Sequence, residues 1–356
     1  MPGPSPWSRR LLFAGLLASG SAQAFTYEVL YEDTIGRDAV VFGRTPGFQA
    51  VAKSVLLDGS VKTSGTETRT FDRNVINYVK YMQQFAIGSN ASLRLTLPAL
   101  VNYRKEEGEQ TPVIVTESTW LEAKPRLEFV YATQNALDLV LGVDGYHVTE
   151  FEAKSESALF TATDKYEAAS ASYGHLVVVK HGGNFDGGFS FKAAAEKKRN
   201  VTKSTSIDES TFVVEDRIYD PTTIAIFMRT KVKWGLIFGE FAAIEASGGG
   251  NRTDRGATVK EDYFRVQLAG FFPLSGALDL ESTLIYKSLS YADNRNVSMD
   301  TIPMLGLQLK LTANIGVPVF GGLIGVQGTD GQSIPEFNAR YKLFGIGGIA
   351  GIQSNF

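Results

Sequence analysis

The chain has 356 residues, a formal net charge of -3 and a hydrophobic fraction of 44%. So small a charge does not favour a nucleic-acid partner, and no basic stripe with interleaved aromatic residues supports one. The sequence contains no cysteine, which excludes disulfide bonds, thiolate metal sites and a lipid anchor on a cysteine after a cleavage site.

Residues 1–24 have the pattern of a cleavable export signal. Arg9 and Arg10 precede an apolar run from Leu11 to Ala18, and small residues then lead to an alanine-x-alanine cleavage pattern that ends at Ala24. The mature chain, residues 25–356, is expected to form a single domain. It contains no run that approaches the roughly 18 consecutive apolar residues of a membrane helix.

Residues 25–48 precede the regular part of the mature chain. They contain two short alternating stretches, Tyr27 to Tyr31 and Arg37 to Arg44. These stretches predict either an extra pair of strands or an N-terminal segment that folds into the rest of the domain.

The segment from Trp120 to Val143 predicts a hairpin with two different faces. Apolar residues occupy the odd positions on both arms, whereas the even positions of the first arm are charged. An alternation of period two indicates a strand with one apolar and one polar face. Ten or more such residues are long for a soluble strand and sufficient to cross a membrane at a tilt.

The register of this hairpin follows from its alternation. Because outward residues are odd on both arms, the loop must contain an odd number of residues. A three-residue loop at 133–135, whose last residue, Asn135, adopts the left-handed conformation, satisfies this condition. Phe129 would then face Leu139, and Lys124 would face Asp144 on the inner side.

The same alternation recurs along the mature chain and predicts an all-β, antiparallel, up-and-down transmembrane barrel of about 14 strands, within a range of 12 to 16. Short and long connections alternate, as in outer-membrane barrels. The long connections at 59–73 and 198–221 are long enough to fold inward and constrict the lumen. The expected strands are residues 49–58, 74–87, 92–103, 119–132, 136–150, 166–180, 185–195, 222–230, 232–244, 259–272, 277–290, 301–312, 315–327 and 335–346.

Two features do not fit uniform strands. Pro98, Pro125 and Pro318 lie inside expected strands and are each interpreted as a bulge or a strand end, because proline cannot donate to a ladder. The residues from Ile346 to the terminal Phe356 depart from strict alternation, so the last strand is expected to end near residue 344.

The export signal, the lack of cysteine, the alternating strands and the terminal Phe356 together resemble a Gram-negative outer-membrane β-barrel. The segment Tyr78 to Tyr103 is also similar to the strand-turn-strand of phenol-degradation-pathway and fatty-acid-transporter-like transport barrels, through its stretch from Gly88 to Pro98. The resemblance implies a location in the cell outer membrane and recognition by the outer-membrane assembly machinery. It carries no functional residue with it.

A barrel of about 14 strands has an interior too wide for side chains to fill. The predicted function is therefore a passive channel or transporter for small solutes with a mixed-charge lumen; the alternative is a structural or surface-interaction barrel with a closed, salt-bridged lumen. Lumen-lining candidates are Arg94, Glu122, Lys124, Arg126, Glu128, Asp138, Asp144, Lys233, Arg265, Glu281, Lys287 and Arg340.

Outer-membrane lipids are expected partners of such a barrel. Lys197, Lys198 and Arg199 form the densest basic run and are candidates to contact the phosphates of lipopolysaccharide. His147 and Ser170 have outward parity on neighbouring expected strands, an arrangement similar to outer-membrane phospholipases. The histidine-serine-asparagine signature of that family is missing, so we expect no enzymatic activity, no cofactor and no metal site.

Overall fold

The computed structural model describes residues 34–42, 45–63, 66–108, 115–133, 135–156, 161–166, 168–194, 200–207, 210–249, 257–293, 298–315, 317–328 and 339–355. The predicted export signal, the stretch Tyr27 to Tyr31 and Phe356 lie outside these residues. Within the described ranges, no helix is both long enough and apolar enough to cross a membrane.

The described residues form one helix and 18 strand segments. The helix is α2 (Ile35–Phe42). The strand segments are β1 (Gly47–Thr63), β2 (Thr66–Ala86), β3 (Ala91–Gly108), β4 (Val115–Ala123), β5 (Arg126–Ala132), β6 (Leu137–Val148), β7 (Phe151–Glu156), β8 (Thr161–Tyr166), β9 (Ala169–His181), β10 (Phe185–Ala194), β11 (Asn200–Ile207), β12 (Ser210–Val232), β13 (Gly235–Gly249), β14 (Ala257–Ser275), β15 (Leu278–Asp293), β16 (Ser298–Asn314), β17 (Pro318–Gly328) and β18 (Ala339–Asn355).

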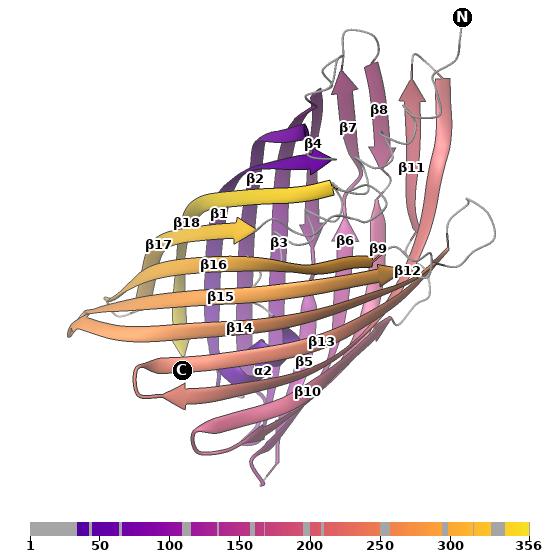
Figure 1. Ribbon diagram of the computed structural model, residues 1–356. Coiled ribbons are helices and arrows are strands. Elements are labelled where there is room, and N and C mark those ends of the chain that lie inside the picture. Colours follow the sequence, from indigo (N-terminus) through magenta and orange to yellow (C-terminus); the bar gives the residue numbers. More distant parts are fainter. Residues whose placement is uncertain are drawn as a thin grey trace, which may run out of the picture.

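The strand segments close into a barrel of 14 antiparallel strands (Figure 1). Four strands are interrupted and appear as the pairs β4 and β5, β6 and β7, β8 and β9, and β10 and β11. The first strand, β1, pairs with β2 on one side and with the last strand, β18, on the other, so the described sheet has no free edge at this seam. The expected up-and-down barrel and its strand count are therefore confirmed.

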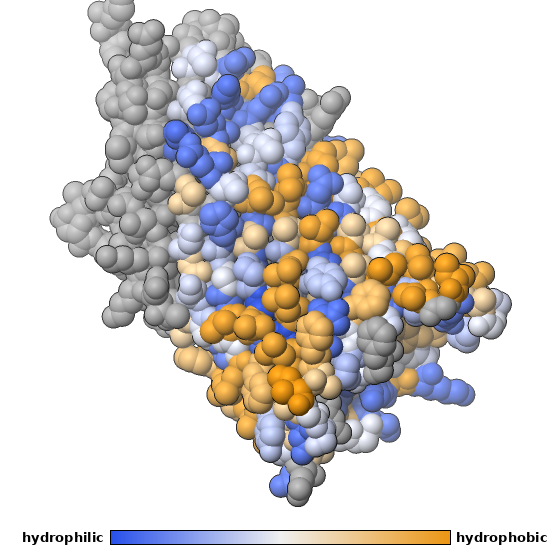
Figure 2. Space-filling view, turned by 180° about the vertical axis from the view of Figure 1, so that it is seen from behind, coloured by the Kyte–Doolittle hydropathy of each residue, from blue (hydrophilic) through white to orange (hydrophobic). Residues whose placement is uncertain are grey.

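Side chains alternate between the barrel interior and its outer surface. On β5, Arg126, Glu128 and Val130 are buried, whereas Leu127 and Phe129 are 43% and 41% exposed. Apolar side chains cover much of the outer face in Figure 2, and hydrophilic ones gather toward its upper end. A closed antiparallel barrel with such an outer face is typical of proteins in Gram-negative outer membranes, as expected from the sequence.

The hairpin between β5 and β6 has the predicted faces and a different register. Phe129 pairs with Leu141 and not with Leu139, so the predicted register is wrong by two residues. The connecting loop is two residues longer than predicted, and its left-handed residue is Ala136, with φ 55°, instead of Asn135. A shift by two residues leaves each side chain on its predicted face.

The three prolines differ in their positions. Pro125 separates β4 from β5 and Pro318 begins β17, which confirms the interpretation as strand ends. Pro98 lies inside β3 without a register shift, so the bulge or strand end predicted there is wrong. Backbone hydrogen bonding between the strands continues at Pro98 and Pro125 because a proline carbonyl oxygen can still accept a hydrogen bond. Lys124 N donates to Pro98 O (3.0 Å), and Gly145 N donates to Pro125 O (2.7 Å).

Several strands extend far beyond the length that a membrane requires. The strands β2 and β12 have 21 and 23 residues, against roughly 9 to 11 residues for a membrane crossing. Most of the predicted loops 59–73 and 198–221 is therefore strand, because polar side chains do not prevent backbone pairing above the membrane. The last strand also continues to Asn355, so the expected end near residue 344 is wrong.

The helix α2 covers most of the stretch from Arg37 to Arg44, for which a strand was one of the two predicted alternatives. It begins after Thr34, whose hydroxyl Oγ1 accepts a hydrogen bond from Arg37 N (3.2 Å) while its carbonyl oxygen accepts one from Asp38 N (3.0 Å). Figure 1 shows α2 inside the barrel, near the short turns. Of the two predicted alternatives for residues 25–48, the described part is a segment folded into the barrel.

The seam between β1 and β18 depends on a glycine. A Cβ atom on Gly347 would lie 1.9 Å from the carbonyl oxygen of Ser54, whereas one on its neighbour Gly348 would lie 3.8 Å from the nearest atom, the Gly322 oxygen. We expect Gly347→Ala to destabilise the barrel by about 1–3 kcal/mol and Gly348→Ala to leave it unchanged. Urea unfolding in lipid vesicles measures this difference, and equal stabilities for the two variants would contradict a close seam.

Candidate functional site

An apolar seat on the barrel wall holds one side of α2. Ala39 and Val40 of the helix are each 2% exposed. Gly36 allows a close approach to β12, because a Cβ atom there would lie 2.4 Å from the Phe227 ring. The wall residues that form the seat are Val130, Val140, Val177, Val179, Phe227 and Phe238.

A carboxylate on the helix enters a cationic part of the wall. Asp38 is fully buried and pairs with Arg126 of β5 and with Lys80 of β2, whose Nζ lies 3.7 Å from Oδ1. Arg94 of β3 donates a hydrogen bond from Nη1 to the backbone oxygen of Asp38 (3.1 Å). The strands β2, β3 and β5 therefore each contribute one cationic side chain that binds Asp38 of α2.

The helix is also tied to the opposite side of the barrel. Arg37 donates from Nε to Oε1 of Gln267 on β14 (3.1 Å), and β14 lies six strands away from the strand of Arg126 in the pairing order. Because α2 bonds to nearly opposite walls and packs on β9, β10 and β12 between them, it crosses the lumen.

Strand register explains how the polar wall residues meet. Arg94 pairs with Glu128, Glu128 with Gly142, Gly142 with His175, and His175 with Lys192. The row thus runs across β3, β5, β6, β9 and β10 at one height. The next row on the turn side contains Val130, Val140 and Val177 of the apolar seat, so a polar and an apolar row lie next to each other.

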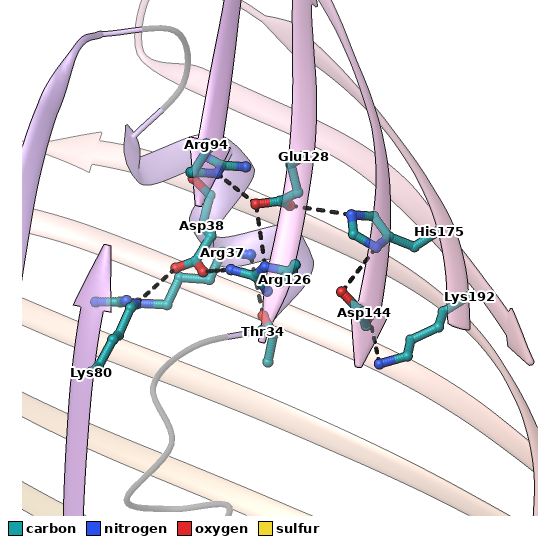
Figure 3. A network of polar contacts seen from close by, with 10 residues as sticks. All are labelled: Thr34, Arg37, Asp38, Lys80, Arg94, Arg126, Glu128, Asp144, His175 and Lys192. Atoms are coloured by element: carbon teal, nitrogen blue, oxygen red, sulfur yellow. Dashed lines mark hydrogen bonds and ion pairs between the residues drawn. The ribbon is translucent and has the colours of Figure 1, made fainter. Parts of the chain in front are cut away.

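Glu128 is the centre of this row (Figure 3). Its carboxylate oxygens lie 2.7 Å from Arg94 Nε, 3.2 Å from Arg126 Nε and 3.2 Å from His175 Nε2. The side chains of Glu128, Arg94 and His175 are fully buried. A carboxylate removed from water in this way is tolerated only because several charged partners surround it.

His175 joins two carboxylates from different strands. Its Nε2 faces Glu128, and its Nδ1 lies 3.2 Å from Asp144 Oδ1, while Asp144 also pairs with Lys192 (2.6 Å). A carboxylate on each side of the ring favours its positively charged form. The imidazolium form of His175 therefore fits this position and connects β5, β6 and β9.

A second histidine has a similar arrangement nearer the short turns. His181 lies between Asp138 (Nε2 to Oδ2, 2.9 Å) and Asp186 (Nδ1 to Oδ1, 3.0 Å). Arg229 of β12 donates from Nε to Asp186 (2.8 Å). These contacts link β6, β9, β10 and β12. The carboxylates of Asp138 and Asp186 already pair with His181 and Arg229, so we do not interpret them as ligands of a metal ion.

Most of the predicted lumen residues that the structure describes are buried or partly buried. Glu281 is partly buried and pairs with Lys310, and Glu122 is 12% exposed at its side chain. The side chain of Arg340 and the basic residues 197–199 fall outside the described part of the chain. The buried members of the predicted set are Arg94, Arg126, Glu128, Asp138, Asp144, Arg265 and Lys287.

The partner predicted for Lys124 and the position predicted for Lys233 are wrong. Lys124 has a side chain that is 44% exposed and pairs with Glu122 (2.7 Å) instead of Asp144, because the hairpin register places Arg126 opposite Asp144. Lys233 lies in the exposed turn after β12, since this strand continues to Val232 and the predicted turn came too early.

Sequence reasoning missed Asp38, Lys80 and His175 as members of the site. Lys80 has the inward parity of its strand, so the alternation Tyr78, Lys80, Met82 could have identified it. The other two gave no comparable signal, because the role of Asp38 depends on where α2 lies and that of His175 on carboxylates of neighbouring strands.

Gly142 provides the space that His175 needs. A Cβ atom on Gly142 would lie 2.2 Å from Cε1 of His175 and 2.9 Å from Cγ of Glu128. We expect Gly142→Ala to displace the imidazole and to cost about 1–3 kcal/mol of barrel stability. Gly174→Ala is the control, because Gly174 precedes His175 and has no atom within 4 Å of a Cβ.

Unfolding in urea and the chemical shift of the His175 ring would measure this effect. An imidazole that keeps its environment in Gly142→Ala would show that the close approach between β6 and the ring is not required.

The outer surface brings together the pair considered for catalysis. His147 Nδ1 lies 3.3 Å from Ser170 Oγ, and the contact is exposed. The part of the chain that the structure describes contains no group of three or more His, Asp or Glu residues able to hold a metal ion.

No protein-family model matches the chain, and no curated protein matches it. Solved structures do. The toluene transporter TodX of Pseudomonas putida has a TM-score of 0.54 at 10% identity, covering 88% of this chain and 90% of that one. The toluene transporter TbuX of Ralstonia pickettii scores 0.52 at 7% identity, covering 87% and 90%. A FadL homologue of Pseudomonas aeruginosa scores 0.51 at 7% identity, covering 88% and 90%.

These likenesses extend over nearly the whole chain at very low identity. They confirm, at the level of the fold, the expected resemblance to fatty-acid-transporter-like barrels. The chain has the fold of these outer-membrane transport barrels.

Proposed function

We propose that the protein is a passive outer-membrane channel for small, mainly apolar solutes, and that α2 is the obstruction that must shift for a solute to pass. The observation that carries the proposal is a closed barrel whose lumen is crossed, within the described residues, by one short helix. A helix held by discrete contacts can leave its seat, whereas a lumen filled by wall side chains cannot open.

An apolar inner patch supports the apolar character of the solute. It lies on the loop side of α2, on β1, β2, β3 and β17, where seven hydrophobic side chains are 4% exposed or less and the buried Asn102, opposite Ile76, is a polar neighbour. Apolar linings with few polar groups are typical of small-molecule sites. The patch consists of Val55, Leu57, Ile76, Tyr78, Leu100, Ile324 and Val326.

Two of the structural neighbours are toluene transporters, which fits an apolar solute here as well. The charged residues of the wall are mostly paired with each other and with α2, so they contribute less to the lining of a path than the sequence alone suggested. We therefore propose a channel whose wall is largely apolar on the loop side of α2, in place of the mixed-charge lumen predicted from the sequence.

Uptake by intact cells tests the proposal. Gram-negative cells that lack related transporters, with and without this chain, would be given radiolabelled toluene at low concentration. We expect faster accumulation with the chain and no change for a sugar of similar size. Equal toluene uptake would overturn the proposal and favour the alternative, a closed barrel that serves a structural or surface-binding role.

The proposal includes no catalysis. The exposed contact between His147 and Ser170 makes this testable: esterase activity that disappears in His147→Ala would contradict it. Contacts with lipopolysaccharide and with the outer-membrane assembly machinery stay predictions of the sequence.

A further inference from the structure

Three consecutive short turns, after β12, β14 and β16, expose large apolar side chains. Ile315 is 75% exposed, Leu274 is 58% exposed and Trp234 is 47% exposed. The turn between β14 and β15 projects at the left of Figure 1, and the corresponding end at the right of Figure 2 is covered by hydrophobic side chains. We call this surface the apolar rim; it consists of Trp234, Phe272, Leu274, Ile315 and Val317.

The turns after β5 and β9 have a different character. Residues 133–136 and 182–184 are polar or small, and Gly183 and Asn184 are exposed. Beyond the seam of β1 and β18, the turn after β2 again exposes an apolar residue, Ile87. The turn end of the barrel is therefore divided into an apolar arc, from β12 round to β3, and a polar arc, from β5 to β10.

The apolar rim continues the outer face of the barrel wall. Gly270 of β14 has the outward parity of the exposed Phe264 and Phe272. A Cβ atom on Gly270 would lie 2.9 Å from the Phe272 ring and 3.8 Å from the Trp234 ring, so both rings cover this glycine. Phe271 N also donates to Trp234 O (2.9 Å), which joins two neighbouring turns. The lipid-facing surface of the wall thus extends without a break onto the turns.

Two cations accompany the aromatic ring of the rim. Lys231 and Lys233 are exposed, at the end of β12 and in the turn that contains Trp234. Tryptophan and lysine side chains favour the boundary between acyl chains and polar headgroups, because each combines an apolar part with a polar end. An exposed apolar patch marks a surface that binds a protein or a membrane. Phospholipid fits best here, since the rim is continuous with the lipid-facing wall and its cations complement lipid phosphates.

We propose that the apolar rim is inserted in the phospholipid leaflet on the turn side of the outer membrane, with Lys231 and Lys233 at the lipid phosphates, whereas the turns after β5 and β9 lie in water. The barrel is then immersed more deeply along the apolar arc than along the polar arc. This inference concerns how the barrel is positioned in the membrane and does not depend on the proposed function.

Quenching of tryptophan fluorescence tests the insertion. The sequence contains Trp7, in the predicted export signal, Trp120 and Trp234, so Trp120→Phe leaves Trp234 as the single reporter of the mature chain. This substitution keeps an aromatic ring against Phe151, on which Trp120 stacks (5.4 Å). In vesicles of phosphatidylcholine and phosphatidylglycerol with brominated acyl chains, we expect strong quenching of Trp234. Acrylamide, present on both sides of the membrane, should quench it weakly.

The polar arc supplies the matched control. A Cβ atom on Gly183 would have no atom within 4 Å, so Gly183→Trp, in a background of Trp120→Phe and Trp234→Phe, introduces a reporter without a clash. We expect this reporter to be quenched severalfold less by brominated lipid, and severalfold more by acrylamide, than Trp234. Asn135→Trp in the other polar turn is a second control, and Leu274→Trp should behave like Trp234.

Each variant must first migrate as a folded barrel in an unheated gel. Equal lipid quenching of Trp234 and of the Gly183→Trp reporter would overturn the inference, because both arcs would then lie at one depth. Quenching of Trp234 mainly by acrylamide would also overturn it and would favour a protein partner for the rim. Lys231→Glu combined with Lys233→Glu should weaken the lipid quenching of Trp234, and unchanged quenching would contradict the contact with phosphates.

Discussion

Deletion of α2, residues 35–42, should turn the barrel into an open pore. The helix bonds to β2, β3 and β5 on one side and to β14 on the other, and a barrel of this strand number has an interior wider than its own side chains fill. In a planar bilayer we expect the intact protein to conduct poorly and the deletion variant to show frequent, severalfold larger conductance steps.

The wall should remain a barrel without the helix, because the ladder from β1 to β18 is closed independently of α2. Unheated gel migration checks this. Arg37→Gln is a useful intermediate, since it removes the tie to Gln267 of β14 while the contacts of Asp38 remain, and it should increase conductance less than the deletion. Unchanged conductance in a folded deletion variant would show that another part of the chain closes the lumen.

Glu128→Met should be the most destabilising single substitution in the wall. This carboxylate lies within 3.2 Å of Arg126 and His175 and 2.7 Å from Arg94, so its removal leaves buried cations facing each other. Breaking a buried ion pair by removing one partner costs about 3–5 kcal/mol. We expect a loss of this size in urea unfolding from lipid vesicles.

A double substitution separates charge from packing. Arg94→Met combined with Glu128→Met should lose less stability than the two single losses added, because the second change removes one of the stranded cations. Glu281→Met is the control: its pair with Lys310 is partly exposed, and pairs of that kind contribute about 0–1 kcal/mol. A Glu128→Met variant no weaker than Glu281→Met would contradict a central role for Glu128.

Side-chain parity could be read from the sequence with high fidelity. Arg126, Glu128 and Asp144 were assigned to the interior, and Leu127 and Phe129 to the outer face, because a strand in a membrane barrel must separate polar from apolar residues at every second position. The same rule yielded the strand number, since each strand carries its own alternation.

Register could not be read in the same way. When the pairing of β5 and β6 shifts by two residues, every side chain stays on the same face of the hairpin. Parity therefore does not distinguish Leu139 from Leu141 as the partner of Phe129. The left-handed turn residue is alanine, which has no strong preference for this conformation, and so the loop length was underestimated. Because of this error, Lys124 was predicted to face Asp144, whereas Arg126 is its partner in the structure.

The sequence by itself determined that the chain is a membrane barrel of about 14 strands with a charged inner wall, because alternation is a local property of each strand. The tertiary structure decided what the charges do. Asp38, Arg94, Arg126 and Glu128 come from α2, β3 and β5, and their meeting depends on strand register and on a helix folded into the lumen. Both depend on contacts between residues distant in the chain, which no local pattern encodes.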